Sequence, residues 1–181
     1  MDEGLTWIRI VKDFLPMKEI EESGLWTWLI AKGFFSAPAS TKYHGASING
    51  LVKHSFNVAH KLDSMSNELT FPNCRWDRPE SPKIVGLFHD LCKIDSYRYV
   101  PETGKYEYRT DNIVTGHGMK SVIYLQQFIK LTEQEIACMI YHMGAFTDSK
   151  EWNNYTNAIK KYPEVLLTHT ADMYITHVLG L

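Results

Sequence analysis

Apolar residues recur at helical spacing along most of this chain, and that period constrains its fold more than any other feature. Between residues 49 and 65 the inner stripe consists of Leu51, Val52, Ser55, Val58, Ala59 and Leu62. A stripe of this kind faces the core from one side of an α-helix. Comparable helices are predicted over residues 5–15, 19–31, 82–94, 119–130, 132–143 and 163–179, with a shorter one at 152–160. We therefore predict an all-α fold, built as a helical bundle.

One segment departs from the helical period. Residues 97–109 read YRYVPETGKYEYR, in which tyrosines alternate with polar residues on both sides of a Pro-Glu-Thr-Gly turn. Alternation of period two around such a turn is typical of a β-hairpin. We predict a small inserted hairpin near residues 97–109. Its tyrosines, Tyr97, Tyr99, Tyr106 and Tyr108, could stack on a base, although a tyrosine face packed on the domain is favoured.

The length and composition favour one folded unit. A chain of 181 residues with 44% apolar content can build one core but is too short for two ordinary ones. No internal repeat is visible. We expect a single domain over residues 1–181, in which residues 1–33 form a helical extension packed on a core of residues 34–181.

Charge and cysteine content exclude several classes of protein. The net charge of −2 provides no general attraction to nucleic acid or to an anionic membrane. Cys74, Cys92 and Cys138 form no CxxC pair, which argues against a disulfide framework and against a cysteine zinc knuckle. No apolar run reaches the roughly 18 residues of a membrane span, and the acidic start is unlike a signal peptide. We expect a cytoplasmic protein that does not associate with a membrane.

The most informative dipeptide is His89-Asp90, which lies among apolar neighbours in the segment LFHDLCK. Imidazole and carboxylate are both good ligands for first-row divalent metals, and a buried charge needs a partner or a metal. A single His-Asp pair is more often satisfied by ordinary hydrogen bonds. Lys93 follows Asp90 by three residues, so on a continuous helix it would share the same face.

Other histidines and an aspartate change that assessment. His54, His117, His142 and Asp172 each lie on or beside a different predicted helix. Each alone could be a satisfied core residue or a helix cap. Together with His89-Asp90 they suit a metal site that is built by the facing helices of a bundle.

The order His…His-Asp…His…His…Asp resembles the HD-domain superfamily of metal-dependent phosphohydrolases. The likeness runs from about residue 34 to residue 181 through the segments NGLVKHS, HDLCK, GHG, IYHMG and HTADM, and HDLCK is similar to the family's HDxxK motif. The most similar variety is the HD module of certain bacterial 3′→5′ exoribonucleases and of related uncharacterised bacterial and phage hydrolases. Those exoribonucleases carry an OB fold in front, for which this chain has no room, so nucleic acid is possible but not favoured as a substrate.

The resemblance implies one or two divalent metal ions and an enzymatic role for several residues. His54, His89, Asp90 and Asp172 would surround a first ion, and Asp90 would bridge to a second ion completed by His117 and His142. The ion could be manganese, iron, nickel, cobalt, zinc or magnesium. Asp90 and Lys93 would be catalytic, Asp90 by accepting a proton from water and Lys93 by stabilising charge on the phosphoryl group.

The implied substrate is a small phosphorylated molecule, in the first place a nucleotide, cleaved as a phosphomonoester or phosphodiester. His44, Lys53 and Arg109 are candidates for contacting an anionic substrate. His44 could equally be an ordinary loop histidine, and residues such as Lys53 and Arg109 are more often plain solvated charges. His169 could orient Asp172 through a hydrogen bond or be purely structural. His60 and His177 are assigned to the structural background, and the oligomeric state stays open.

Three other functions remain compatible with the same ligands. A di-iron oxygenase similar to the inositol oxygenases would use four histidines and two aspartates in the same arrangement. A regulatory module could bind a nucleotide without turnover, and a nuclease could cleave single-stranded nucleic acid. Oxygen uptake, ligand-induced stabilisation without metal, and oligonucleotide cleavage would separate these functions.

Overall fold

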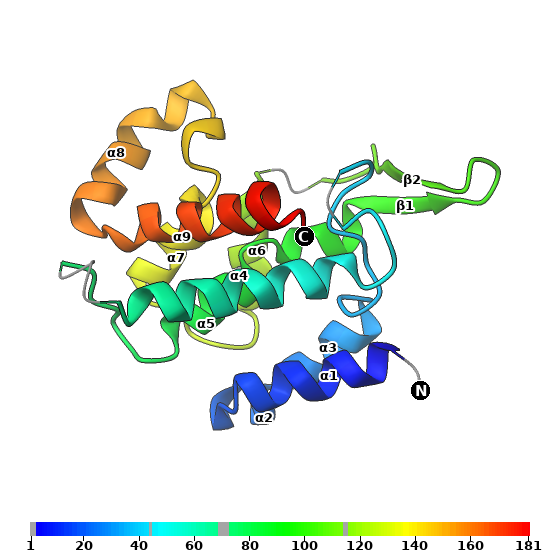
Figure 1. The fold of residues 1–181 in the computed structure, drawn as a ribbon, viewed down its shortest axis with the longest axis horizontal. Coiled ribbons are helices and arrows are strands. Elements are labelled where there is room, and N and C mark those ends of the chain that lie inside the picture. The colour runs from blue at the N-terminus through cyan, green and yellow to red at the C-terminus, as the bar shows by residue number, and fades with distance from the viewer. Residues whose placement is uncertain (1–2, 44, 69–72, 114–115) are drawn as a thin grey trace.

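The computed structural model describes residues 3–43, 45–68, 73–113 and 116–181. Across these residues the fold is mostly helical with one two-stranded antiparallel sheet, so the predicted fold class is confirmed (Figure 1). The α-helices are α1 (Glu3–Phe14), α2 (Lys18–Ser23), α3 (Leu25–Ala31), α4 (Gly50–Ser66), α5 (Ser81–Phe88), α6 (His117–Leu125), α7 (Glu133–Tyr141), α8 (Trp152–Lys161) and α9 (Glu164–Met173). Short 3-10 turns are η1 (Leu91–Asp95), η2 (Gly144–Phe146) and η3 (Ser149–Glu151), and a π-helical turn, η4 (Tyr174–Leu179), extends α9.

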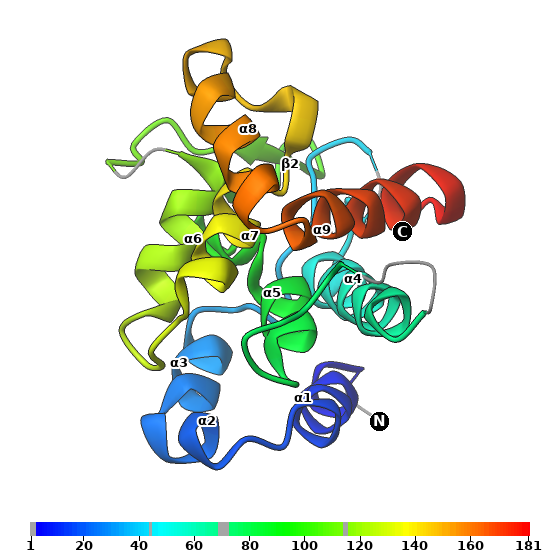
Figure 2. The ribbon, with the colours of Figure 1, turned by 90° about the vertical axis from the view of Figure 1, so that its left-hand side faces the viewer.

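Helix α4 is the centre of the bundle. It packs against α5 on one side and α9 on another, and α7 contacts α5, α6 and α9 (Figure 2). All six residues of its predicted inner stripe are buried. Gly86 allows α5 to approach α4 closely, since a Cβ at that position would lie 2.3 Å from the Cα of Ala59. These contacts bring α4, α5, α7 and α9 around one point.

The N-terminal helices pack on this bundle through aromatic side chains. Trp7 and Phe14 of α1 meet Phe56 of α4 edge to face, with ring centroids 5.6 and 5.1 Å apart. Trp28 of α3 meets Tyr124 of α6 in the same way at 5.6 Å. Helices α1 to α3 lie on the side of the molecule opposite α8 (Figure 2).

Two predicted helices are interrupted. The predicted helix over residues 19–31 divides into α2 and α3 at Gly24, whose φ of 81° is left-handed. The predicted helix over residues 82–94 ends at Phe88, because the φ of −103° and ψ of 17° at Asp90 leave the helical region and a 3-10 turn follows. His89 and Asp90 therefore lie at a helix end and not within a helix.

The start of α5 is held by a contact with a distant segment. Ser81 is the first helical residue and does not cap the helix. Its hydroxyl donates a 2.7 Å hydrogen bond to the buried carboxylate of Glu135, which also binds Arg78 and closes a capping box with Thr132. The hydroxyl of Ser81 thus ties the start of α5 to α7.

The hairpin is confirmed as β1 (Tyr97–Val100) paired with β2 (Lys105–Tyr108), and Tyr97 stands opposite Tyr108. It projects from the bundle beside the loop that precedes α4 (Figure 1). The expected packing of its tyrosine face is wrong in part, because Tyr99 and Tyr108 are 55% and 65% exposed. In the described part of the chain, no helix is both long enough and apolar enough to span a membrane.

Candidate metal centre

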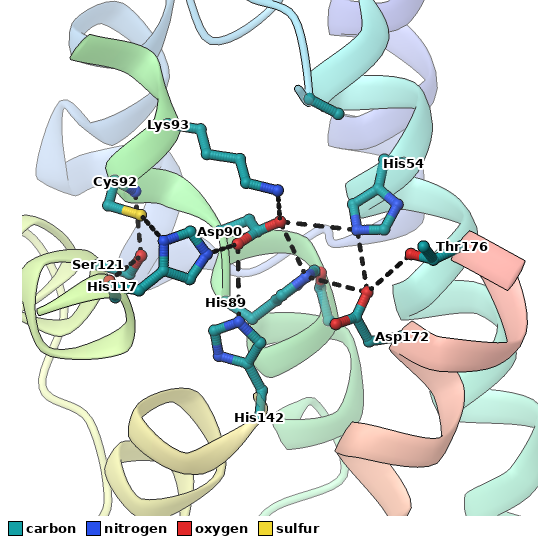
Figure 3. A network of polar contacts seen from close by, with 12 residues as sticks. His54, His89, Asp90, Cys92, Lys93, His117, Ser121, His142, Asp172 and Thr176 are labelled. Carbon is teal, nitrogen blue, oxygen red and sulfur yellow. Dashed lines mark hydrogen bonds and ion pairs between the residues drawn. The ribbon is translucent and has the colours of Figure 1, made fainter. Parts of the chain in front are cut away.

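Four histidines and two aspartates from different elements meet at one point in the bundle (Figure 3). They are His54 of α4, His89 and Asp90 at the end of α5, His117 at the start of α6, His142 after α7, and Asp172 of α9. The structure thus brings together all six residues that the sequence suggested as metal ligands. Because these residues belong to separate elements, the site lies where α4, α5, α7 and α9 pack together.

Asp90 lies at the centre of this group. Its Oδ2 atom is 3.6 Å from His54 Nε2 and 3.4 Å from His89 Nε2. Its Oδ1 atom is 2.5 Å from His117 Nε2 and 3.6 Å from His142 Nε2. Each oxygen of one carboxylate thus faces a different pair of imidazoles, which is the arrangement that a bridging ligand requires.

Asp172 faces the same centre from α9. Its Oδ1 atom lies 3.2 Å from His54 Nε2 and 3.9 Å from His89 Nε2. The hydroxyl of Thr176, one turn further along, donates a 3.4 Å hydrogen bond to the same oxygen. This contact orients the carboxylate toward the two imidazoles, as Figure 3 shows.

The outer nitrogen of each imidazole is held by a second contact. Nδ1 of His89 lies 2.8 Å from the carbonyl oxygen of Gly86, and Nδ1 of His142 lies 2.7 Å from that of Met139. Nδ1 of His54 lies 3.1 Å from the main-chain oxygen of Leu181. A carbonyl only accepts hydrogen bonds, so each of these Nδ1 atoms carries a proton. In the neutral form that binds a metal, the ring would therefore present the lone pair of Nε2 to the centre.

His117 has a different outer partner. Its Nδ1 lies 3.3 Å from the thiol sulfur of Cys92, the residue immediately before Lys93. The main-chain N–H of Cys92 in turn donates a 3.0 Å hydrogen bond to Ser121 Oγ on α6. Cys92 therefore ties η1 to α6 at the point where His117 enters the site.

The charges of the site favour a bound cation. Burial acts to raise the pKa of Asp90, but the ammonium of Lys93 and the neighbouring imidazoles outweigh it and hold that pKa well below its ordinary value. Burial also acts to raise the pKa of Asp172, and the hydrogen bond from His54 helps to lower it overall. Both carboxylates are thus ionised at neutral pH. Burial lowers the pKa of His142, which keeps its ring in the neutral form that binds metals.

Two buried nitrogens provide a direct test of whether a metal fits. The Nε2 atoms of His89 and His142 are buried and make no hydrogen bond to any of the described residues. A buried polar atom without a partner costs about 1–3 kcal/mol, which a metal ion would relieve. Nitrogen and carboxylate donors suit zinc, iron, manganese, nickel and cobalt. The donor set therefore fits a divalent ion.

The ligand atoms fall into overlapping groups of three. Within each group the donor atoms lie within 4.8 Å of one another. The groups are His54, His89 and Asp90; Asp90, His117 and His142; and His89, His142 and Asp172. Asp90 belongs to the first two groups, so the geometry has room for one ion or for two ions that share this carboxylate.

A cavity of about 830 Å³ opens onto this centre. Asp90, Asp172 and His117 line it together with Lys93, whose Nζ lies 2.6 Å from Asp90 Oδ2. Its other walls are largely apolar and are formed by Ala39, Tyr43, Tyr97, Tyr108, Met143, Phe146 and Met173. The candidate metal centre is thus accessible from one side and buried in the bundle on the other.

The three candidates for substrate contact lie elsewhere or are not described. Lys53 pairs with Glu3 of α1 at 2.6 Å, on another face of α4 from His54. Arg109 forms a 2.7 Å ion pair with the exposed Asp111. Neither lines the cavity. His44 lies outside the described residues.

Several residues near the site have contacts that the sequence did not predict. His169 does not bind Asp172, since its Nδ1 lies 2.8 Å from the carbonyl oxygen of His142 and so supports the end of α7. His177 lines the cavity, although the sequence placed it in the background. The contacts of Leu181 and Cys92 were also missed, because they join segments far apart and no local pattern marks them.

No protein-family model, no curated protein and no solved structure matches this chain. The function of this chain must therefore be inferred from the residues and geometry of the site itself.

Proposed function

We propose that this chain is a metal-dependent phosphohydrolase of the HD type, which acts on a nucleotide or another small phosphate ester. The observation that carries the proposal is the central position of Asp90, which faces four imidazoles while also pairing with Lys93 at the edge of a cavity. The order of these residues along the chain is similar to the HD signature. Hydrolysis of a phosphomonoester or phosphodiester is the reaction that this combination suits best.

The six ligands would divide between two ions. His54, His89, Asp90 and Asp172 would hold the first, and Asp90, His117 and His142 the second. A divalent ion bound there would lower the pKa of a coordinated water from about 15.7 toward about 7 and would neutralise charge on the phosphate.

Lys93 would act on the substrate from beside Asp90. Burial acts to lower the pKa of Lys93, but Asp90 outweighs it and raises that pKa, so the ammonium stays charged. An ammonium has three N–H donors and can hold Asp90 and a phosphoryl oxygen at the same time. Fixed positive charge at this position would stabilise the negative charge that develops during attack on phosphorus.

Asp90 would also serve in proton transfer. Its carboxylate stays ionised at neutral pH and is available to accept a proton from the attacking water. The buried positions of His89 and His142 exclude bulk water from the inner side of the site. No serine or cysteine nucleophile is needed for this reaction.

The test is phosphate release from a panel of phosphate esters by manganese-loaded protein, with metal content measured on the same samples. We expect turnover by the wild type and its loss, together with loss of bound metal, in Asp90→Asn. Asp111→Asn is the matched control, because Asp111 is an exposed carboxylate that is ion-paired outside the cavity. Wild-type protein that binds no divalent ion would refute the proposal, and substrate-dependent oxygen uptake by iron-loaded protein would replace it with the oxygenase.

A further inference from the structure

Three strongly exposed aromatic side chains surround the cavity. Tyr43 is 80% exposed, Tyr108 is 65% exposed and Phe146 is 68% exposed, and all three line the cavity. They come from separate segments: the loop before α4, strand β2 and the turn η2. Exposed aromatic surface that gathers around a concave site is characteristic of ligand binding, because a ligand would remove that surface from water.

The structure braces one of these rings. Tyr108 stands opposite Tyr97 in the hairpin, and their rings meet edge to face with centroids 5.0 Å apart. Tyr97 is itself held by a 3.5 Å hydrogen bond from its hydroxyl to the carbonyl oxygen of Ala39. Tyr108 is thus supported at one side while most of its surface stays open. A supported aromatic ring of this kind suits stacking on a flat ligand ring.

The charges of the cavity limit the number of phosphoryl groups that it can hold. Of the described residues that line it, Lys93 is the sole lysine or arginine. Its ammonium is already engaged with Asp90. A triphosphate spreads several negative charges over three phosphoryl groups and is generally bound by more basic groups than this, in addition to metal ions. A single phosphoryl group matches the available positive charge better.

We propose that the cavity takes a phosphate monoester whose alcohol part carries a flat aromatic ring. The phosphoryl group would lie beside Lys93 and Asp90, and the ring would stack on Tyr108 with Phe146 nearby. This inference rests on the proposed function for the position of the phosphoryl group. Nucleoside monophosphates and simple aryl phosphates share this chemistry, and the relative affinities of their phosphonate analogues separate them.

The first test measures binding without turnover. Methylphosphonate, benzylphosphonate and a nucleoside phosphonate are titrated calorimetrically into manganese-loaded protein. We expect both aromatic compounds to bind about tenfold more tightly than methylphosphonate, since one ring stacking interaction contributes roughly that factor. The tighter binder of the two identifies the preferred source of the ring. Equal affinities for all three compounds would overturn the inference.

Variants of the hairpin locate the effect. Tyr108→Ala is expected to weaken the aromatic phosphonates about tenfold and to leave methylphosphonate unchanged, whereas Tyr108→Phe keeps the wild-type affinities. Tyr99→Ala is the matched control, because Tyr99 lies in the same hairpin and is 55% exposed but does not line the cavity. An unchanged affinity in Tyr108→Ala would overturn the proposed stacking.

The second test uses turnover of a nucleoside monophosphate, the corresponding triphosphate and glycerol phosphate. We expect the highest kcat/KM for the monophosphate. In Tyr108→Ala we expect a higher KM for the monophosphate with little change in kcat, because stacking binds the ground state and the transition state equally. A higher kcat/KM for the triphosphate would overturn the inference. If no ester is hydrolysed, the proposed function fails, while the binding experiment still decides the preference for an aromatic ring.

Discussion

His54 Nδ1 lies 3.1 Å from the main-chain oxygen of Leu181, a residue 127 positions further along the chain. Gly180, with a left-handed φ of 70°, turns the backbone after η4, and the N–H of Leu181 then donates to the carbonyl oxygen of Ile175 at 3.1 Å. The end of the described chain thus holds one candidate metal ligand in place. Because the acceptor is a main-chain oxygen, the contact depends on backbone position and not on the leucine side chain.

Removing Gly180 and Leu181 is therefore expected to weaken metal binding. Loss of an outer hydrogen bond to a metal-binding histidine typically costs about ten- to a hundredfold in affinity. Cobalt titration followed by visible absorption measures this change, and the absorption band also reports the ligand geometry. Leu181→Ala is the control that keeps the main-chain oxygen and should retain wild-type affinity. Equal cobalt affinity in the truncated chain would contradict a positioning role for this contact.

Metal removal is expected to destabilise the fold. The buried Nε2 atoms of His89 and His142 have no hydrogen-bond partner among the described residues, and two ionised carboxylates face each other across the same centre. Manganese at a hundredfold excess over its dissociation constant would add about 2.7 kcal/mol to the free energy of unfolding. Thermal melting with EDTA and after re-addition of manganese checks this. The melting temperature of Asp90→Asn should not change when manganese is added. A wild-type melting temperature that is the same with and without EDTA would count against a metal centre.

Lys93 and Lys53 are expected to behave differently when each is replaced by methionine. Lys93 lines the cavity beside Asp90, so Lys93→Met should lower kcat/KM on the order of a hundredfold while bound metal is retained. Lys53 pairs with Glu3 away from the cavity, and Lys53→Met should cost less than about 1 kcal/mol of stability and leave kcat/KM unchanged. Steady-state kinetics and metal analysis on both variants decide the matter. A comparable loss of activity in the two would show that the assignment of Lys93 is wrong.

Gly86→Ala is expected to destabilise the bundle by about 1–3 kcal/mol, as overpacking of a core generally does. The added Cβ would meet the backbone of Ala59 at 2.3 Å, and neither helix can yield by moving a flexible side chain. Chemical denaturation measures the change in the free energy of unfolding. Ser64→Ala, on the exposed surface of α4, should stay within about 0.5 kcal/mol of the wild type. Wild-type stability in Gly86→Ala would mean that α4 and α5 are packed less tightly than the structure shows.

Local patterns were enough to predict the fold class and the hairpin. The apolar stripe of α4 and the tyrosine alternation around Gly104 each reflect a period that is set by the geometry of one element. The chemistry of histidine and aspartate side chains likewise singled out six candidate ligands. The same patterns could not reveal the break at Asp90, since apolar spacing continues across it while the backbone turns.

The sequence by itself determined that this chain is helical, that it carries one hairpin and that six of its residues are suited to a metal. Only the tertiary structure decided which faces meet, and so brought those six together, turned Lys53 outward and set Leu181 against His54. The aromatic rim of the cavity, with Tyr108 and Phe146, also arises only on folding. The physical reason is that helical period records which side of each element is apolar, whereas the position of a side chain in space depends on contacts between segments far apart along the chain.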